Sequence, residues 1–198
     1  MTSLTRFTTG FVLGGSLLLA SCSSLDYQGP KNRPEQASAV TGMNAEQRGA
    51  DVKELNKLVS IFIDSGELYK DAAKMTNTPS HAAVLNRLSD SRMARAKEGQ
   101  RRVAALGGDP ATKGEALGVG HMALMKVREA VGNDTKIAMD ETLRGEDYVV
   151  DQIEKRLEDP EISSMSQNWL TQILPEIKSE RDEIKALDEA IKARNKAG

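Results

Sequence analysis

Four long amphipathic patterns constrain the fold of this chain more than any other feature of its sequence. In each of them apolar side chains recur every three or four residues, which is the spacing of one face of an α-helix. The patterns cover approximately residues 50–75, 80–106, 135–157 and 161–193. No stretch alternates apolar and polar residues as a half-buried strand does. The sequence therefore predicts an all-α fold in which four helices pack as a bundle.

Helix-breaking residues separate these patterns. Thr78-Pro79 ends the first, Gly107-Gly108-Asp109-Pro110 ends the second, and Asp159-Pro160 ends the third. The connection between the second and third patterns is long enough for a short helix of its own, from Glu115 to Val131. A long connection at this place is a feature of ferritin-like bundles. We therefore expect a ferritin-like helical bundle over residues 49–195, with a short extra helix between helices two and three.

The N-terminal segment is of a different kind. Arg6 precedes an apolar run from Phe11 to Ala20, which is the pattern of a secretory signal peptide. The run is shorter than the roughly 20 apolar residues that a permanent membrane-spanning helix needs. It ends in Leu19-Ala20-Ser21-Cys22, which resembles the lipobox of bacterial lipoproteins. The resemblance implies cleavage of a signal peptide over residues 1–21 and attachment of acyl chains such as palmitate to Cys22.

The interpretation of Cys22 has consequences for the rest of the chain. It is the only cysteine, so once acylated it leaves none for a disulfide, a metal thiolate or a redox pair. The resemblance to lipoproteins also implies a periplasm-facing location, and Ser23 in place of aspartate favours the outer membrane over the inner one. Residues 22–48 are rich in polar residues, proline and glycine, so we expect a flexible spacer there. The alternative is an ordinary signal peptide followed by an incidental cysteine.

Charge and motifs exclude several functions. Loss of Arg6 with the signal peptide leaves 26 basic against 29 acidic side chains, a net charge of about −3. This balance does not favour nucleic acid as a partner. The sequence contains no Gly-x-Ser-x-Gly elbow, His-Glu-x-x-His helix or phosphate loop. We therefore expect a non-enzymatic protein that holds no cofactor. Its expected role is to bind or scaffold an unidentified envelope protein, and this role includes a response to stress.

A few positions break the apolar face of the helices near mid-length. Arg92, Glu146 and Glu180 each have apolar residues at the three-and-four positions around them, so their side chains should point along the apolar face. Gly66 in the first helix leaves room for a long neighbouring side chain, and Tyr69 offers a hydroxyl group. In an up-and-down bundle these five positions can meet at one level.

The chemistry of this level follows from its charges. A buried carboxylate costs several kcal/mol unless a cation or hydrogen bonds compensate it. One guanidinium can serve two carboxylates through its fork of donors, so we expect Arg92 to hold both Glu146 and Glu180 without a metal. Tyr69 would add a hydrogen bond. The other interpretation places these polar groups at the edge of a broad apolar stripe, facing water.

The same residues carry a family resemblance. The chain resembles the bacterial domain of unknown function 2383 family, whose members are ferritin-like four-helix domains, over residues of about 55–187. The pattern comprises Asp64 and Tyr69, Arg92 and Glu98, Leu106-Gly107-Gly108-Asp109-Pro110, Arg144-Gly145-Glu146-Asp147, and Asp182. The resemblance implies the fold rather than an activity.

Metal binding is the alternative that this resemblance raises. Ferritin-like proteins with two metal ions use inward glutamates and Glu-x-x-His pairs on facing helices. The residue three positions after Glu98 is Arg101, and the residue three positions after Glu180 is Glu183. The alternative function is therefore a degenerate iron or manganese protein, an oxidase or a metal store, that uses Glu98, Glu146 and Glu180.

Both histidines lie away from these acidic residues in the sequence. His81 opens the second helix, and His121 lies in the predicted short helix. A convincing metal site needs several ligands that converge on one point. We therefore expect both histidines to have surface or core-edge roles.

Overall fold

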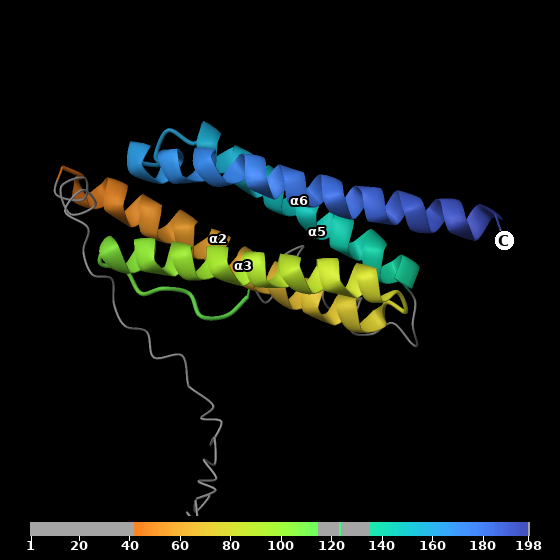
Figure 1. The fold of residues 1–198 in the computed structure, drawn as a ribbon. Helices are drawn as coiled ribbons and strands as arrows, with labels where there is room; N and C mark the ends of the chain where they lie inside the picture. The colour runs from red at the N-terminus through yellow and green to blue at the C-terminus, as the bar shows by residue number, and fades with distance from the viewer. Residues whose placement is uncertain (1–41, 115–122, 124–134, 198) are drawn as a thin grey trace, which may run out of the picture.

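The computed structural model describes residues 42–114, 123 and 135–197. These residues form four helices, α2 (Ala45–Met75), α3 (Pro79–Ala105), α5 (Thr135–Glu158) and α6 (Ser164–Ala197). In Figure 1, α2 and α6 run from left to right, whereas α3 and α5 run from right to left. The described residues contain no strand. The prediction of an all-α four-helix bundle is confirmed.

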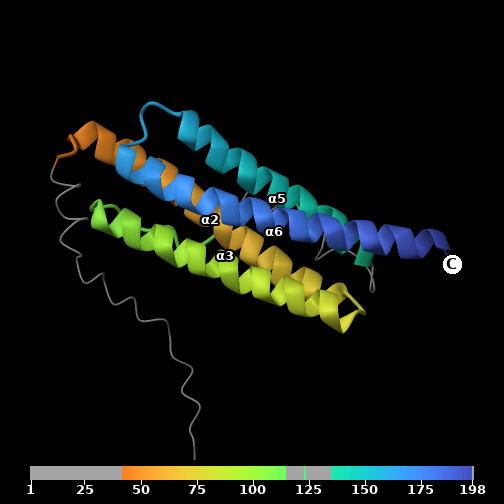
Figure 2. The same ribbon diagram turned by 45° about the horizontal axis from the view of Figure 1, so that its top comes forward.

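The helices are arranged as two hairpins. Helix α2 packs closely on α3, α5 packs on α6, and α2 also packs on α5. Figure 2 shows the α5–α6 hairpin lying over the α2–α3 hairpin. Because α3 ends where α2 begins and α5 begins at the opposite end, residues 106–134 connect the two ends of the bundle. This is the long connection of a ferritin-like bundle.

The apolar core contains two large clusters that follow one another along the bundle, beside a small cluster of Leu68 and Ala123. One cluster lies near the start of α2 and includes Phe62, Ile153 and Trp169. The other lies toward the end of α2 and includes Leu85 and Met139. Buried polar side chains lie on α3 and α5 in the interval between the two clusters. The level predicted to be polar therefore separates two apolar regions.

Helix α2 begins ahead of the predicted domain boundary at residue 49. The side chain of Asn44 accepts a hydrogen bond from the N–H of Gln47 at 2.8 Å, and its carbonyl accepts one from the N–H of Arg48 at 3.1 Å. An asparagine in this N-cap position satisfies backbone donors that a helix start otherwise leaves free. Residues 45–48 therefore belong to the helix and not to the predicted spacer.

Helix α3 ends as its glycines predict. Gly107 has a φ of 80°, in the left-handed region that glycine adopts readily. Its N–H donates to Ala104 O, and the N–H of Gly108 donates to Val103 O, both at 3.0 Å. These two hydrogen bonds form a Schellman motif, which satisfies the last carbonyls of the helix and turns the chain back.

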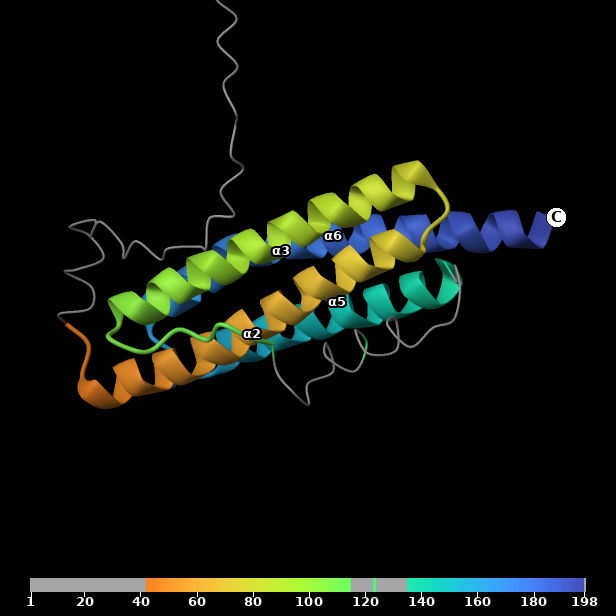
Figure 3. The same ribbon diagram turned by 90° about the horizontal axis from the view of Figure 1, so that it is seen from below.

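The segment after α3 runs back along α2 as far as residue 114 (Figure 3). Asn56 holds it at two points, because its side chain donates to Asp109 O at 2.8 Å and accepts from Ala111 N at 2.7 Å. Further along, the backbone of Gly114 lies directly over the buried carboxylate of Asp64, where a Cβ would come within 1.8 Å of Oδ1. The first part of the long connection is thus fixed to α2.

Several predictions lie outside the described residues. They are the signal peptide, Cys22, the spacer as far as residue 41, His121 and, apart from Ala123, the short helix over residues 115–131. Among the residues that the structure describes, no helix is both long and apolar enough to span a membrane.

Candidate functional site

Arg92 is the most deeply buried charged side chain at the middle of the bundle. It occurs on the face of α3 that also carries Leu85, Leu88 and Ala96, and none of its side chain is exposed. Glu146 on α5 is 1% exposed and Glu180 on α6 is 16% exposed. The helical spacing of apolar residues therefore places one cation and two carboxylates in the interior.

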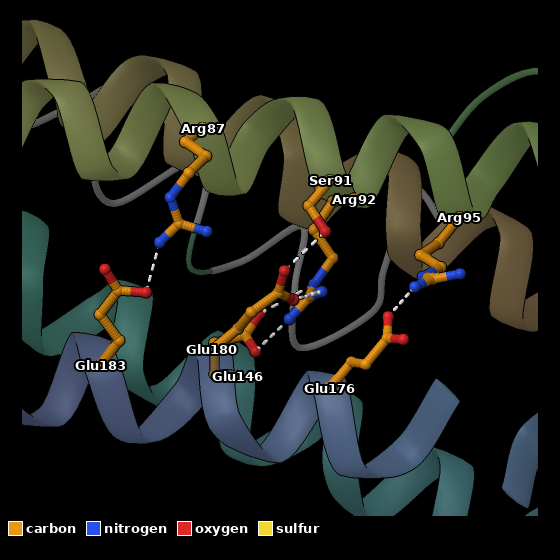
Figure 4. Close-up of polar contacts among 8 residues, drawn as sticks. All are labelled: Arg87, Ser91, Arg92, Arg95, Glu146, Glu176, Glu180 and Glu183. Atoms are coloured by element: carbon orange, nitrogen blue, oxygen red, sulfur yellow. Dashed lines mark hydrogen bonds and ion pairs between the residues drawn. The ribbon is translucent and has the colours of Figure 1, made fainter. Parts of the chain in front are cut away.

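The guanidinium of Arg92 uses all three of its nitrogens. Nε donates to Glu146 Oε1 at 3.1 Å and Nη2 donates to Glu146 Oε2 at 2.5 Å, which makes a bidentate pair. Nη1 donates to Glu180 Oε2, and Glu180 Oε1 accepts from the Ser91 hydroxyl at 2.6 Å (Figure 4). Each carboxylate oxygen thus has a donor. Charge-assisted, bidentate hydrogen bonds of this kind are about twice as strong as neutral ones.

Tyr69 adjoins the site from α2, but its buried hydroxyl has no hydrogen-bond partner among the described residues, so the predicted hydrogen bond is not formed. The Cζ of Arg92 lies over its ring, 5.9 Å from the ring centre, near the outer limit for a cation–π contact. Burial raises the pKa of Tyr69 well above its ordinary value, and the negative charge of Glu146 raises it further. The phenol is therefore neutral. We call Tyr69, Ser91, Arg92, Glu146 and Glu180 the central cluster.

The charge state of Arg92 is determined by its neighbours. Burial by itself lowers the pKa of Arg92, but the negative charges of Glu146 and Glu180 raise it above its ordinary value. A guanidinium without carboxylates would be costly at this depth, and the carboxylates would be equally costly without it. The three charges thus depend on one another.

Two further ion pairs join α3 and α6 on either side of the central cluster. Arg87 pairs with Glu183, and Arg95 pairs with Glu176 (Figure 4). Their side chains are partly exposed, so water screens them more than it screens Arg92. Helices α3 and α6 are therefore joined by a row of basic side chains on one helix and glutamates on the other.

The structure does not bring every predicted residue to this level. A Cβ at Gly66 would lie 2.8 Å from Met93 Sδ, so the long side chain for which this glycine leaves room is Met93. Glu98 pairs instead with Arg95 and Arg102, at 3.2 Å in both cases. Gly66 therefore provides the predicted room for a long side chain, whereas Glu98, which was predicted to join the site in the metal alternative, does not join it.

The remaining residues of the family pattern have separate positions. Asp182 is exposed and pairs with Arg181 at 2.8 Å, and Arg144 pairs with Glu141 at 3.3 Å. His81 is buried near the start of α3 and is 7% exposed. Its position agrees with the core-edge role expected of it.

The residues of the central cluster do not fit a metal ion. All four oxygens of Glu146 and Glu180 are used by Arg92 and Ser91, and Arg92 itself cannot be a ligand because it stays protonated. The neutral phenol of Tyr69 is a poor ligand. In the part of the chain that the structure describes, no three histidine, cysteine, aspartate or glutamate side chains are grouped to hold an ion. Chemistry that depends on a metal held by Glu98, Glu146 and Glu180 thus has no support in this geometry.

A second buried carboxylate was not predicted. Asp51 on α2 has no exposed surface, and it accepts hydrogen bonds from the N–H and hydroxyl of Ser163 and from the hydroxyl of Ser166. The hydroxyl of Ser163 also accepts from the N–H of Ser166 at 3.3 Å, at the start of α6. We call these three residues the end cluster. It fixes the first turn of α6 to the first turns of α2.

A local signal for part of the end cluster exists in the sequence. Two serines three residues apart at a helix start are typical of an N-cap. The partner Asp51 lies more than 100 residues away along the chain, however, and no local pattern connects it to them. The serines were therefore detectable as a cap, whereas the carboxylate that binds them was not.

Comparisons with known proteins agree with this fold. The structure is similar to a solved structure of a Dps1 mutant from Mycobacterium smegmatis, with a TM-score of 0.60 and 17% sequence identity over 74% of this chain and 99% of that chain. At this identity the similarity shows the ferritin-like fold and no more. A search of the curated proteins gives no match. The family model described as "Domain of unknown function (DUF2383)" matches residues 50–159, which is more than half of the chain. The chain therefore belongs to the DUF2383 family.

Proposed function

We propose that this chain is a lipid-anchored envelope protein whose ferritin-like bundle has a non-enzymatic binding or scaffolding role. The observation that carries this proposal is the central cluster. Arg92 occupies the middle of the bundle and binds both interior glutamates of that level. A bundle that supplies its own cation has no need of a metal at this level in order to fold, and it keeps no ligands free for catalysis there.

The proposed anchor depends on the sequence Leu19-Ala20-Ser21-Cys22. Acyl chains on Cys22 would bind a membrane with about 0.8 kcal/mol for each buried CH₂, and more than one chain makes the attachment stable. The first turn of α2 lies at the same end of the bundle as the first turn of α6 and the last turn of α3. In this proposal that end is the one nearer the membrane, and the loop over residues 76–78 is at the far end.

Membrane fractionation tests the anchor. Wild-type protein should be recovered in the membrane fraction, and Cys22→Ala should move it to the soluble fraction while leaving the bundle folded. Ser23→Asp is the matched variant, since it keeps the cysteine and changes only the residue that favours the outer membrane. We expect Ser23→Asp to stay in membranes but to shift toward the inner one. Membrane recovery of Cys22→Ala equal to that of wild type would contradict the proposal.

Cross-linking in the intact envelope tests the binding role. A scaffolding protein should give discrete cross-linked products that persist when Glu146 is changed to Gln in a variant that still folds. The alternative, a degenerate iron or manganese protein, predicts iron oxidation by the purified protein that depends on Glu146. Oxidation of iron by wild type, lost in Glu146→Gln, would replace the proposal with that alternative.

A further inference from the structure

We propose that Tyr69, Ser91, Glu146 and Glu180 form a binding site specific for a guanidinium group, which Arg92 occupies from within the same chain. The inference concerns the chemistry of the interior and does not depend on the anchor or on the partner. It assigns the site a class of ligand, a planar monovalent cation with donors along two edges. Divalent metal ions and a simple ammonium group fall outside that class.

The shape of the hydrogen bonds supports this class of ligand. Glu146 receives both donors of one guanidinium edge, Nε and Nη2, while Glu180 receives Nη1 from another side. Two carboxylates on different helices thus match the fixed, planar fork of a guanidinium. The ammonium group of a lysine has three rotatable donors on one atom, so it would not fill both edges at these separations.

The surroundings exclude other cations. The ring of Tyr69 lies against the face of the guanidinium and offers it a π surface. The hydroxyl of Ser91 donates to Glu180 Oε1 and Arg92 donates to Oε2, so each oxygen of this carboxylate already accepts a hydrogen bond. A divalent ion takes up carboxylate, imidazole or water ligands around a point. The four side chains instead surround a flat group.

Because the site is buried, its occupancy by a cation can be measured through the stability of the folded protein. Arg92 has no exposed side-chain surface, and Glu146 has almost none. Removal of the guanidinium leaves a cavity lined by two carboxylates, whose repulsion a small guanidinium ligand from solution would relieve. Glu180, which is 16% exposed, lies on the side from which such a ligand could enter.

Chemical rescue of Arg92→Ala tests the proposal. The thermal unfolding midpoint of the purified full-length variant is followed through the fluorescence of Trp169, the only tryptophan and 2% exposed. Methylguanidinium is added up to about 20 mM, far below the molar range in which guanidinium salts denature proteins. At ten times its Kd we expect the midpoint to rise by about 3–6 °C and then to saturate. Potassium at equal ionic strength and manganese(II) should give no rise.

Two controls make the outcome specific. Arg95→Ala removes a partly exposed arginine one turn away, from the same helix, and should show no rescue. Arg92→Lys keeps the charge and should remain less stable than wild type. If Arg92→Ala does not fold alone, recovery of folded protein on refolding with methylguanidinium, but not with potassium, is the same readout. Rescue by manganese(II), equal rescue of Arg95→Ala, or no rescue of Arg92→Ala would each overturn the proposal.

Discussion

The central cluster and the end cluster both bury a carboxylate between distant helices, but they compensate its charge in opposite ways. At the centre, Glu146 and Glu180 are bound by the cation Arg92. At the end, Asp51 is bound only by neutral donors, two serine hydroxyls and one backbone N–H. The centre therefore contains interdependent charges, whereas the end contains one charge held by hydrogen bonds and by the N-terminus of α6.

The location of the two clusters explains the difference. The central cluster lies between the two apolar core regions and away from the helix termini, and its Glu146 is almost fully withdrawn from water. The end cluster lies where α6 begins and where its first N–H groups need acceptors. A helix start can satisfy an acid without a cation, and the middle of a bundle cannot. This distinction leads to the following predictions, in order of decreasing effect.

The largest effect should come from Arg92→Met. The change leaves Glu146 buried without a cation and Glu180 with only Ser91, so we expect a loss of about 3–5 kcal/mol in the free energy of unfolding. Urea unfolding followed by circular dichroism measures it. Adding Glu146→Gln and Glu180→Gln to the same variant should recover a large part of the loss, because no buried charge then remains in the central cluster. Stability of Arg92→Met equal to that of wild type would show that the central charges do not depend on one another.

Matched acid-to-amide changes compare the two clusters directly. Glu146→Gln removes the main partner of a buried cation and should cost about 3 kcal/mol. Asp51→Asn keeps an oxygen that can accept from Ser163 and strands no cation, so it should cost about 1 kcal/mol. The difference between the two unfolding free energies is the quantity of interest. Equal losses would mean that the absence of a cation at Asp51 has no energetic consequence.

Alkaline titration tests the polarity around Tyr69. Burial, and then Glu146, raise the pKa of Tyr69 in the folded protein above its value of about 10 in the unfolded chain. The stability due to this group is fully present below pH of about 10 and is lost as the pH rises toward the folded pKa, by about 1.4 kcal/mol for each pH unit. Tyr69→Phe should therefore lose less stability than wild type over this range.

Phenolate absorbance provides an independent measure of the same group. The chain has three tyrosines, and Tyr69 should ionise only when the protein unfolds. The absorbance change that coincides with unfolding should disappear in Tyr69→Phe. If all tyrosines of the folded protein ionise together near pH of about 10, the phenol is not in the environment described.

The smallest effect is expected at the exposed edge of the row that joins α3 and α6. A double-mutant cycle of Arg87→Gln and Glu183→Gln should give a coupling energy of about 0.2–1 kcal/mol, because both side chains are well exposed. High salt should reduce this coupling, whereas it should change the coupling of Arg92 with Glu146 much less. Coupling energies of similar size for the two pairs would remove the distinction between interior and edge.

Much of the fold and part of the site followed from the sequence. The three-and-four spacing of apolar residues predicted the four helices, and Gly107 marked the end of α3. The same spacing selected Arg92, Glu146 and Glu180, because a polar residue that interrupts an apolar face must point inward. These positions could be predicted because each is a charged residue on the otherwise apolar face of its own helix.

The rest depended on contacts between distant segments. Asp51 is one of several acidic residues near the start of α2, and its burial results from a turn at Ser163 that no local pattern reveals. The space beside Gly66 is filled by Met93 of α3, a contact between two helices that the spacing within α2 could not identify. Asn44 begins α2 within a polar stretch that its composition alone assigns to a spacer.

The metal content of the wild-type protein, purified without chelators from its native envelope, tests most directly whether Arg92 supplies the cation of this interior. The account predicts much less than one iron or manganese ion per chain, and no change when Glu146 is replaced by Gln. One or more ions per chain, retained through purification and lost in Glu146→Gln, would contradict it.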